Sequence, residues 1–146
     1  METIYFSTQI NASPERVWDV MLGKETYGHW AKAFGEGSYY EGNWDEGSDI
    51  KFLGEGGGMG MASRIKESRK PEFVSIEHIG IVSGGVVGTE SEEAKKWAPA
   101  YENYTFVEMD GGTELSVSID VLSEHKSMFE EMWPEALKLL KELAEK

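Results

Sequence analysis

The chain has 146 residues, of which 40% are hydrophobic and 28% charged, so we expect a single domain over residues 1–146 with a packed core. Its 27 acidic and 14 basic residues give a net charge of −13, which argues against nucleic acids and anionic membranes as partners. Because there is no cysteine, disulfides, thiol nucleophiles and thiolate metal sites are excluded.

The N-terminal segment predicts a strand followed by two short helices. Residues 3–10 alternate between apolar and polar side chains, as in a half-buried strand. Ser-Pro-Glu at positions 13–15 then supplies a capping hydroxyl, a proline suited to the first helical position and an acid near the positive end of the helix dipole. Gly23 ends this helix, and residues 25–34 predict a second short helix or turn.

Short strands fill most of the region from residue 35 to residue 122. Breaks that contain glycine or proline separate them, and no long helix intervenes, which indicates an antiparallel meander. The predicted strands are 39–44, 48–53, 59–68, 72–82, 101–109 and 113–122.

The last two of these strands form a hairpin whose register can be predicted. A two-residue loop within positions 110–112 makes the numbers of paired residues sum to an odd value. Tyr104 and Phe106 then share a face with the apolar positions of segment 115–121. We therefore expect both aromatic side chains to point into the interior.

Residues 123–146 predict a long amphipathic helix, with Ser123 as its cap. Pro134 removes one backbone donor, so it should kink the helix or mark where its better-packed half begins. The apolar stripe at helical spacing consists of Phe129, Met132, Trp133, Ala136, Leu137, Leu140 and Leu143.

A long stretch at 83–100 lies between predicted strands and is rich in glycine, then in polar residues. Loops of this length often act as lids or binding loops, and the alternative is a mobile surface excursion. Residues 90–96 are compatible with a helical turn. Trp97 favours a packed role, because a large aromatic side chain in a polar loop usually finds a partner surface.

The order of elements, with three local motifs, resembles the START-like superfamily, also called SRPBCC or helix-grip. Within it, the chain is most similar to the branch that resembles the activator of the heat-shock chaperone ATPase. The motifs are Asn-Ala-Ser-Pro-Glu-Arg-Val-Trp at 11–18, Gly-Gly-Thr-Glu-Leu at 111–115 and Trp-Pro-Glu-Ala-Leu-Lys-Leu-Leu at 133–140. The resemblance implies an α+β fold in which a curved antiparallel sheet of about seven strands wraps around the C-terminal helix.

In many members of this superfamily, the cavity between sheet and helix holds a lipid, sterol, polyketide or hormone-like molecule. Some members are polyketide cyclases or dehydratases, others only bind, and the eukaryotic co-chaperone domain contacts its chaperone through its surface. The branch has no shared catalytic constellation, so the resemblance implies no catalytic residue here.

Two sequence features suggest cofactor or metal sites at first sight. The Gly-rich segment 54–60 lacks a following Gly-Lys-Ser/Thr and joins strand to strand, so we interpret it as a hairpin loop at the cavity rim. His29, His78 and His125 are not at metal-ligand spacing. We therefore predict neither a cofactor nor a metal.

His78 is the best single candidate for a polar group inside the cavity. It alternates with Val74 and Ile76, so it should share their face and could donate a hydrogen bond to a ligand or act as a general base. The alternative is a histidine satisfied by a neighbouring strand or by solvent. The predicted lining of the cavity is Trp30, Trp44, Phe52, Met61, His78, Trp97, Tyr104, Phe106, Phe129 and Trp133.

Three functional hypotheses follow. The first is non-catalytic binding of a small hydrophobic or amphipathic molecule in an internal cavity. The second is a cyclase or dehydratase that uses His78 or a cavity tyrosine as acid or base, and the third is a protein-interaction module that acts through the acidic surface. We expect a monomer or homodimer without a membrane segment. A cytoplasmic location is also expected, because the N-terminus lacks a signal-peptide pattern.

Overall fold

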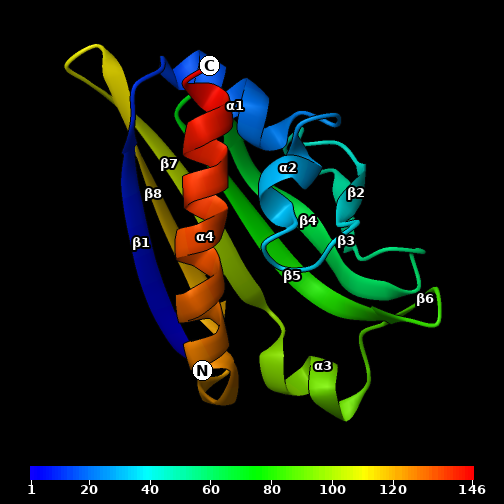
Figure 1. The fold of residues 1–146 in the computed structure, drawn as a ribbon. Coiled ribbons are helices and arrows are strands. Elements are labelled where there is room, and N and C mark those ends of the chain that lie inside the picture. Colours follow the sequence, from blue (N-terminus) through cyan, green and yellow to red (C-terminus); the bar gives the residue numbers. More distant parts are fainter.

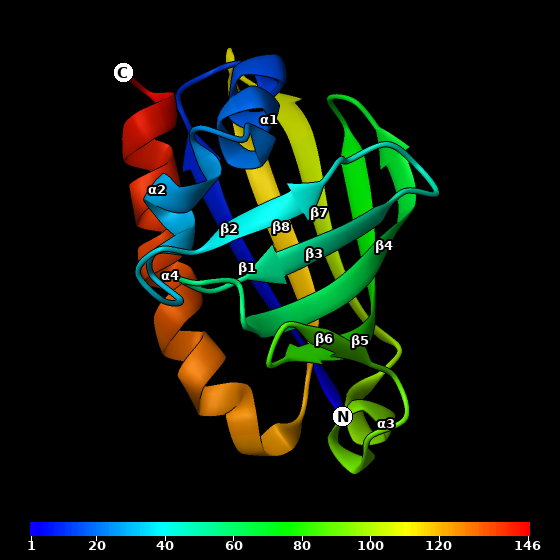
Figure 2. The same ribbon diagram turned by 90° about the vertical axis from the view of Figure 1, so that its right-hand side faces the viewer.

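The computed structural model describes the backbone of residues 1–146 and every side chain except that of Glu93. An antiparallel sheet of eight strands curves around the C-terminal helix (Figures 1 and 2). Its strands are β1 (Glu2–Ile10), β2 (Tyr39–Gly42), β3 (Asp49–Leu53), β4 (Met59–Arg69), β5 (Phe73–Ser83), β6 (Val86–Gly88), β7 (Ala100–Met109) and β8 (Gly112–Val121). The strand order is β1-β8-β7-β5-β4-β3-β2, and β6 pairs with β5 outside this path. The predicted α+β helix-grip fold is confirmed, with β6 as an additional strand.

Four α-helices accompany the sheet: α1 (Pro14–Leu22), α2 (Tyr27–Ala31), α3 (Glu92–Trp97) and α4 (Lys126–Ala144). The cap predicted for α1 is present, since the Arg16 backbone N–H donates to Ser13 Oγ at 3.2 Å. The helix predicted from residue 123 begins instead at Lys126. A 3-10 turn over Ser123–His125 precedes it, so Ser123 is not its cap. None of the described helices is both long enough and apolar enough to span a membrane.

The β7–β8 hairpin has the predicted register. Tyr104 lies opposite Val117, and Met109 pairs with Gly112 across a two-residue loop. Asp110 and Gly111 in this loop have φ angles of 47° and 82°, as a type I′ turn requires. Even-numbered residues of β7 therefore face the interior, where Tyr104 and Phe106 are both buried.

A β-bulge changes the facing pattern along β5. Ala62 pairs with Gly80 and Ser63 with His78, so Ile79 has no counterpart on β4. Val74, Ile76 and His78 face inward before the bulge, and Ile81 faces inward after it. The strand thus presents both His78 and Ile81 to the same interior space.

Helix α4 is divided into two halves that differ in packing. Its buried residues are Trp133, Ala136, Leu137, Leu140 and Ala144, so the packed half is taken as Trp133–Ala144 and the first half as Lys126–Met132. The exposed Pro134 lies at the start of this packed half, and Figure 2 shows α4 bending along its length. Consequently, the first half of α4 extends over the sheet without filling the space beneath it.

The stretch predicted as a long loop contains β6 and α3. Figure 1 shows α3 at the same end of the molecule as the start of α4. The Ala94 backbone N–H donates to Ser91 Oγ at 3.1 Å, which caps α3, and the Ala94 side chain is fully buried. Ala94 therefore anchors α3, whereas residues 83–87 and 89–92 are exposed, and the role of the segment as a lid stays a prediction.

Candidate functional site

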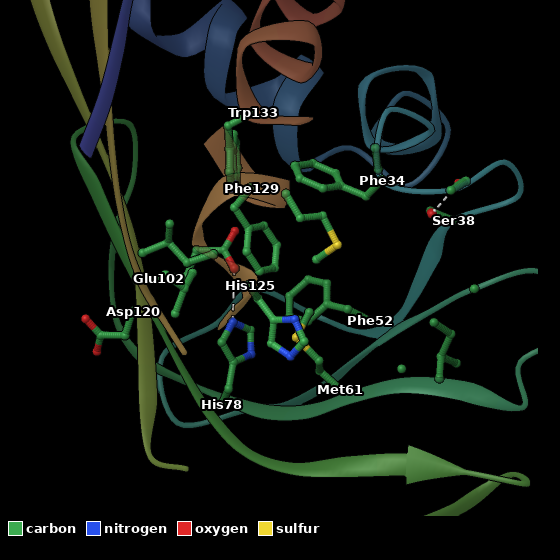
Figure 3. A pocket seen from close by; sticks show the side chains of 18 of the residues that line it. Phe34, Ser38, Phe52, Met61, His78, Glu102, Asp120, His125, Phe129 and Trp133 are labelled. Atoms are coloured by element: carbon green, nitrogen blue, oxygen red, sulfur yellow. Dashed lines mark hydrogen bonds and ion pairs between the residues drawn. The ribbon is translucent and has the colours of Figure 1, made fainter. Parts of the chain in front are cut away.

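A cavity of about 450 Å³ lies between the concave face of the sheet and the first half of α4 (Figure 3). Helix α2, strands β3, β4, β5, β7 and β8, and helices α3 and α4 all contribute side chains. Most of its surface is apolar, and much of it is aromatic. The aromatic lining residues are Tyr27, Trp30, Phe34, Phe52, Trp97, Tyr104, Phe129 and Trp133.

Trp133 of α4 forms one end of the cavity and joins it to the hydrophobic core. Its ring centroid lies 5.0 Å from that of Phe34, 5.8 Å from that of Trp30 and 6.0 Å from that of Tyr104. The Trp30 indole N–H donates to the Met21 carbonyl at 3.0 Å, which fixes α2 against α1. This wall is therefore built from packed, immobilised rings.

The sheet side of the cavity carries a row of buried polar side chains. Ser63 Oγ lies 2.6 Å from His78 Nδ1, and His78 Nε2 lies 3.0 Å from Glu102 Oε1. The Tyr104 hydroxyl donates to the other carboxylate oxygen, Glu102 Oε2. Figure 3 shows the Glu102 carboxylate pointing toward the cavity, with His78 beside it. Ser63 lies behind His78, so it does not line the cavity.

The two buried tyrosines next to this row are held neutral. Burial raises the pKa of Tyr104 well above its ordinary value, and the charge on Glu102 raises it further. Burial, followed by the same Glu102 charge, also raises the pKa of Tyr27. Both phenols therefore remain protonated at physiological pH, and Tyr104 remains a donor to Glu102.

Trp97 of α3 covers the polar row from outside. Its ring stacks on His78 with centroids 5.3 Å apart and an interplanar angle of 20°. Phe52 contacts the same imidazole edge-on at 5.9 Å. The histidine thus contacts two rings, and its hydrogen-bond contacts with Ser63 and Glu102 fix its orientation.

Two further ionisable residues, Asp120 and His125, are among the lining residues. Asp120 is turned away from the cavity in Figure 3, and its carboxylate accepts hydrogen bonds from Thr3 Oγ1 and the Tyr101 backbone N–H at 2.6 and 2.9 Å. His125 is exposed and lies in the turn before α4. Neither side chain belongs to the buried polar row.

Most side chains predicted to line the cavity do so, but Trp44 and Phe106 do not. Trp44 packs on Tyr40 and Phe52, with centroids 5.5 and 5.6 Å away, in the connection between β2 and β3. Phe106 faces inward as predicted, but α1 covers that end of the sheet, so its ring packs on Trp18 at 5.2 Å. The predicted residues that line the cavity are Trp30, Phe52, Met61, His78, Trp97, Tyr104, Phe129 and Trp133.

Sequence reasoning missed Glu102 and Ile81. Glu102 was detectable, because the hairpin register that turns Tyr104 inward does the same for the residue two positions earlier. Ile81 was not, because simple alternation from His78 places it on the outer face and only the bulge at Ile79 brings it inside. The Gly-rich segment is a turn whose ends, Gly54 and Gly60, lie at the cavity.

Among the described side chains, no group of three or more His, Asp or Glu residues is placed to hold a metal ion. The site can instead enclose an apolar molecule and offer it hydrogen bonds at the Glu102–His78 pair.

The match to a protein-family model covers residues 11–145, and that family is described as "Activator of Hsp90 ATPase homolog 1-like protein". The chain belongs to this family. The family branch predicted from the sequence motifs is therefore confirmed. No curated protein matches the chain by sequence.

Solved structures similar to this Hsp90-activator-like chain share its fold. The Aha1 dimer from Colwellia psychrerythraea is 19% identical, with a TM-score of 0.76 over 99% of this chain and 97% of that one. CalU16 from Micromonospora echinospora is 17% identical, with a TM-score of 0.65 over 97% and 75%. DynU16, a protein in the dynemicin biosynthetic locus, is 10% identical, with a TM-score of 0.71 over 97% and 46%.

Proposed function

We propose that the protein binds a small, largely apolar molecule in the cavity between the sheet and α4. The observation that carries this proposal is an aromatic-lined space of about 450 Å³ with a buried polar row at one wall. Small-molecule sites are typically concave, about 300–1,000 Å³ in volume, mostly apolar and supplied with a few placed polar groups.

The surroundings support binding rather than simple core packing. The first half of α4 has no fully buried residue, so an occupant could complete the packing of Phe129 and Phe34. DynU16, a structural neighbour, comes from a biosynthetic locus, which is compatible with a small-molecule role. The family description also names activators of a chaperone ATPase, so contact with a protein partner through the acidic surface stays a separate hypothesis.

Filling part of the cavity should weaken binding. Met61 lines it from β4, so Met61→Trp is expected to weaken binding of the neutral fluorescent probe N-phenyl-1-naphthylamine by about tenfold or more, since each tenfold loss corresponds to about 1.4 kcal/mol. Probe fluorescence titrated against protein measures the Kd.

The matched control is Met109→Trp, which makes the same exchange at an exposed position at the tip of the β7–β8 hairpin. This variant should keep the wild-type affinity. Equal probe affinity in all three proteins would place the probe outside the cavity and contradict the proposal.

A second candidate function is an enzyme that transfers protons in the same cavity. The specific observation that favours it is the Glu102–His78 pair at 3.0 Å, because a carboxylate bonded to an imidazole is a common acid–base arrangement. His78→Gln retains hydrogen-bonding atoms but cannot exchange a proton near neutral pH.

Mass spectrometry of a molecule that co-purifies with the protein from its own host separates the two functions. If the protein is an enzyme, the wild type changes the mass or isomeric form of that molecule over time, and the His78→Gln variant does not. If it only binds, the molecule is unchanged by both proteins.

A further inference from the structure

We propose that the cavity selects ligands that carry a protonated amine, with Glu102 as the counter-ion. This inference rests on the proposed binding function and specifies the chemical class of the ligand. Two observations support it: the charged side chains that point into the cavity, and the positions of the hydrogen atoms in the buried row of Ser63, His78, Glu102 and Tyr104.

Glu102 is the only carboxylate that points into the cavity among the described side chains, since Asp120 is turned away. Its side chain is 10% exposed. No lysine or arginine is among the described lining residues. A charge on Glu102 therefore has no lysine or arginine beside it, and its compensation depends on the lining histidines His78 and His125 or on a ligand.

The hydrogen bonds favour a neutral His78. Ser63 is buried, and its hydroxyl makes no other hydrogen bond among the described side chains, so it donates to Nδ1. The ring proton then sits on Nε2 and is donated to Glu102, which also receives the Tyr104 hydroxyl. Every hydrogen of the row has an acceptor in this arrangement, one negative charge stays on Glu102, and its two oxygens keep free lone pairs for a ligand.

A protonated His78 would disrupt this arrangement. Hydrogens on both ring nitrogens would force Ser63 Oγ to accept, and its own hydrogen would lose its acceptor in a buried position. The row therefore presents an anion to the cavity.

The rest of the lining suits a cation with an apolar body. Aromatic faces attract cations, and several rings, including Trp97 and Phe52 against His78, surround the polar row. The net charge of −13 attracts cations toward the molecule and repels anions. An amine with an aromatic or aliphatic body could place its ammonium at Glu102 and bury the remainder between sheet and helix.

The test uses three probes that share a naphthalene body: 2-(1-naphthyl)ethylamine, 2-(1-naphthyl)ethanol and 1-naphthylacetate. Calorimetric titration near neutral pH keeps the amine protonated, because alkylammonium groups lose their proton only at about pH 10. We expect the amine to bind about tenfold more tightly than the alcohol, because charge-assisted hydrogen bonds are roughly twice as strong as neutral ones. The carboxylate should bind most weakly.

Glu102→Gln should reduce the affinity for the amine to that for the alcohol and leave the alcohol nearly unchanged. Glu114→Gln is the matched control, because it removes the same charge from the outer face of neighbouring β8 and should preserve the preference. If Glu102→Gln does not fold, as judged by circular dichroism, the ranking of the three probes on the wild-type protein decides the question.

The possible failures are distinguishable. If N-phenyl-1-naphthylamine and all three probes fail to bind, the proposed binding function is wrong. If that neutral probe binds but the amine shows no advantage over the alcohol, or the carboxylate binds best, only the amine preference is overturned. An amine preference that survives in Glu102→Gln would also overturn it.

Discussion

Replacing Trp133 by alanine is expected to lower the free energy of unfolding by about 3–5 kcal/mol. Truncating a large aromatic side chain in a core loses its buried apolar surface and leaves a cavity, which together destabilise the fold by that amount. Trp133 is 1% exposed and contacts rings from β1, α2 and β7. It also begins the packed half of α4, so its loss weakens the contact between helix and sheet. A domain of ordinary stability, about 5–15 kcal/mol, would lose a large fraction of it.

Urea denaturation followed by far-ultraviolet circular dichroism measures this loss. Trp97→Ala is the control, because it removes the same side chain from a half-buried position on α3, where its main ring contact is His78. We expect that variant to lose less than half as much stability. Similar losses for both variants would mean that α4 is not anchored at Trp133 as the structure indicates.

Stability should also fall steeply when the pH rises above about 10. The pKa values of Tyr27 and Tyr104 are raised by burial in the folded protein, whereas in the unfolded chain they take the ordinary value of about 10. Above that pH the unfolded chain binds fewer protons than the folded one, so the free energy of unfolding decreases as pH rises. Each tyrosine contributes a slope of about 1.36 kcal/mol per pH unit, or about 2.7 for both.

Denaturant melts between pH 8 and pH 12 measure the slope, and absorbance of the phenolate reports when the buried tyrosines ionise. Tyr104→Phe should halve the slope. Below pH 10 this variant should be less stable than the wild type by about 1.5–3 kcal/mol, because it lacks the hydrogen bond that the Tyr104 hydroxyl donates to the charged Glu102. Its curve therefore approaches that of the wild type as pH rises.

The matched control is Tyr5→Phe, which removes a phenol that is 75% exposed on β1 and should reproduce the wild-type curve. If Tyr104→Phe leaves the alkaline slope unchanged, the buried phenol is not the group that resists ionisation. Early phenolate absorbance in the folded wild-type protein would also contradict the assignment.

Local sequence patterns were sufficient to predict much of the fold. The hairpin register followed from the length of its loop, which is why Tyr104 was correctly placed inside. The apolar stripe of the C-terminal helix identified Trp133 and the residues that pack beneath it. In both cases the information lies within about twenty residues of sequence, where periodicity and turn geometry dominate.

The features that were not predicted depend on contacts between distant segments. Nothing near Phe106 indicates that α1 covers it, and nothing near Ile79 indicates a bulge opposite β4. The row from Ser63 to Glu102 joins three strands, so it emerges only when their registers are combined. The single domain, the cytoplasmic location and the choice between monomer and homodimer stay predictions.

Because the buried residues of α4 begin at Trp133, the two parts of the helix are under different evolutionary constraints, one on stability and one on ligand specificity. Residues from Trp133 onward hold the fold, whereas Met128 and Phe129 face the cavity from a half that carries no fully buried residue. Substitutions in this half should therefore alter which molecule fits with little loss of stability. Such a region is where a lineage could diversify its specificity, and where a laboratory library should be targeted.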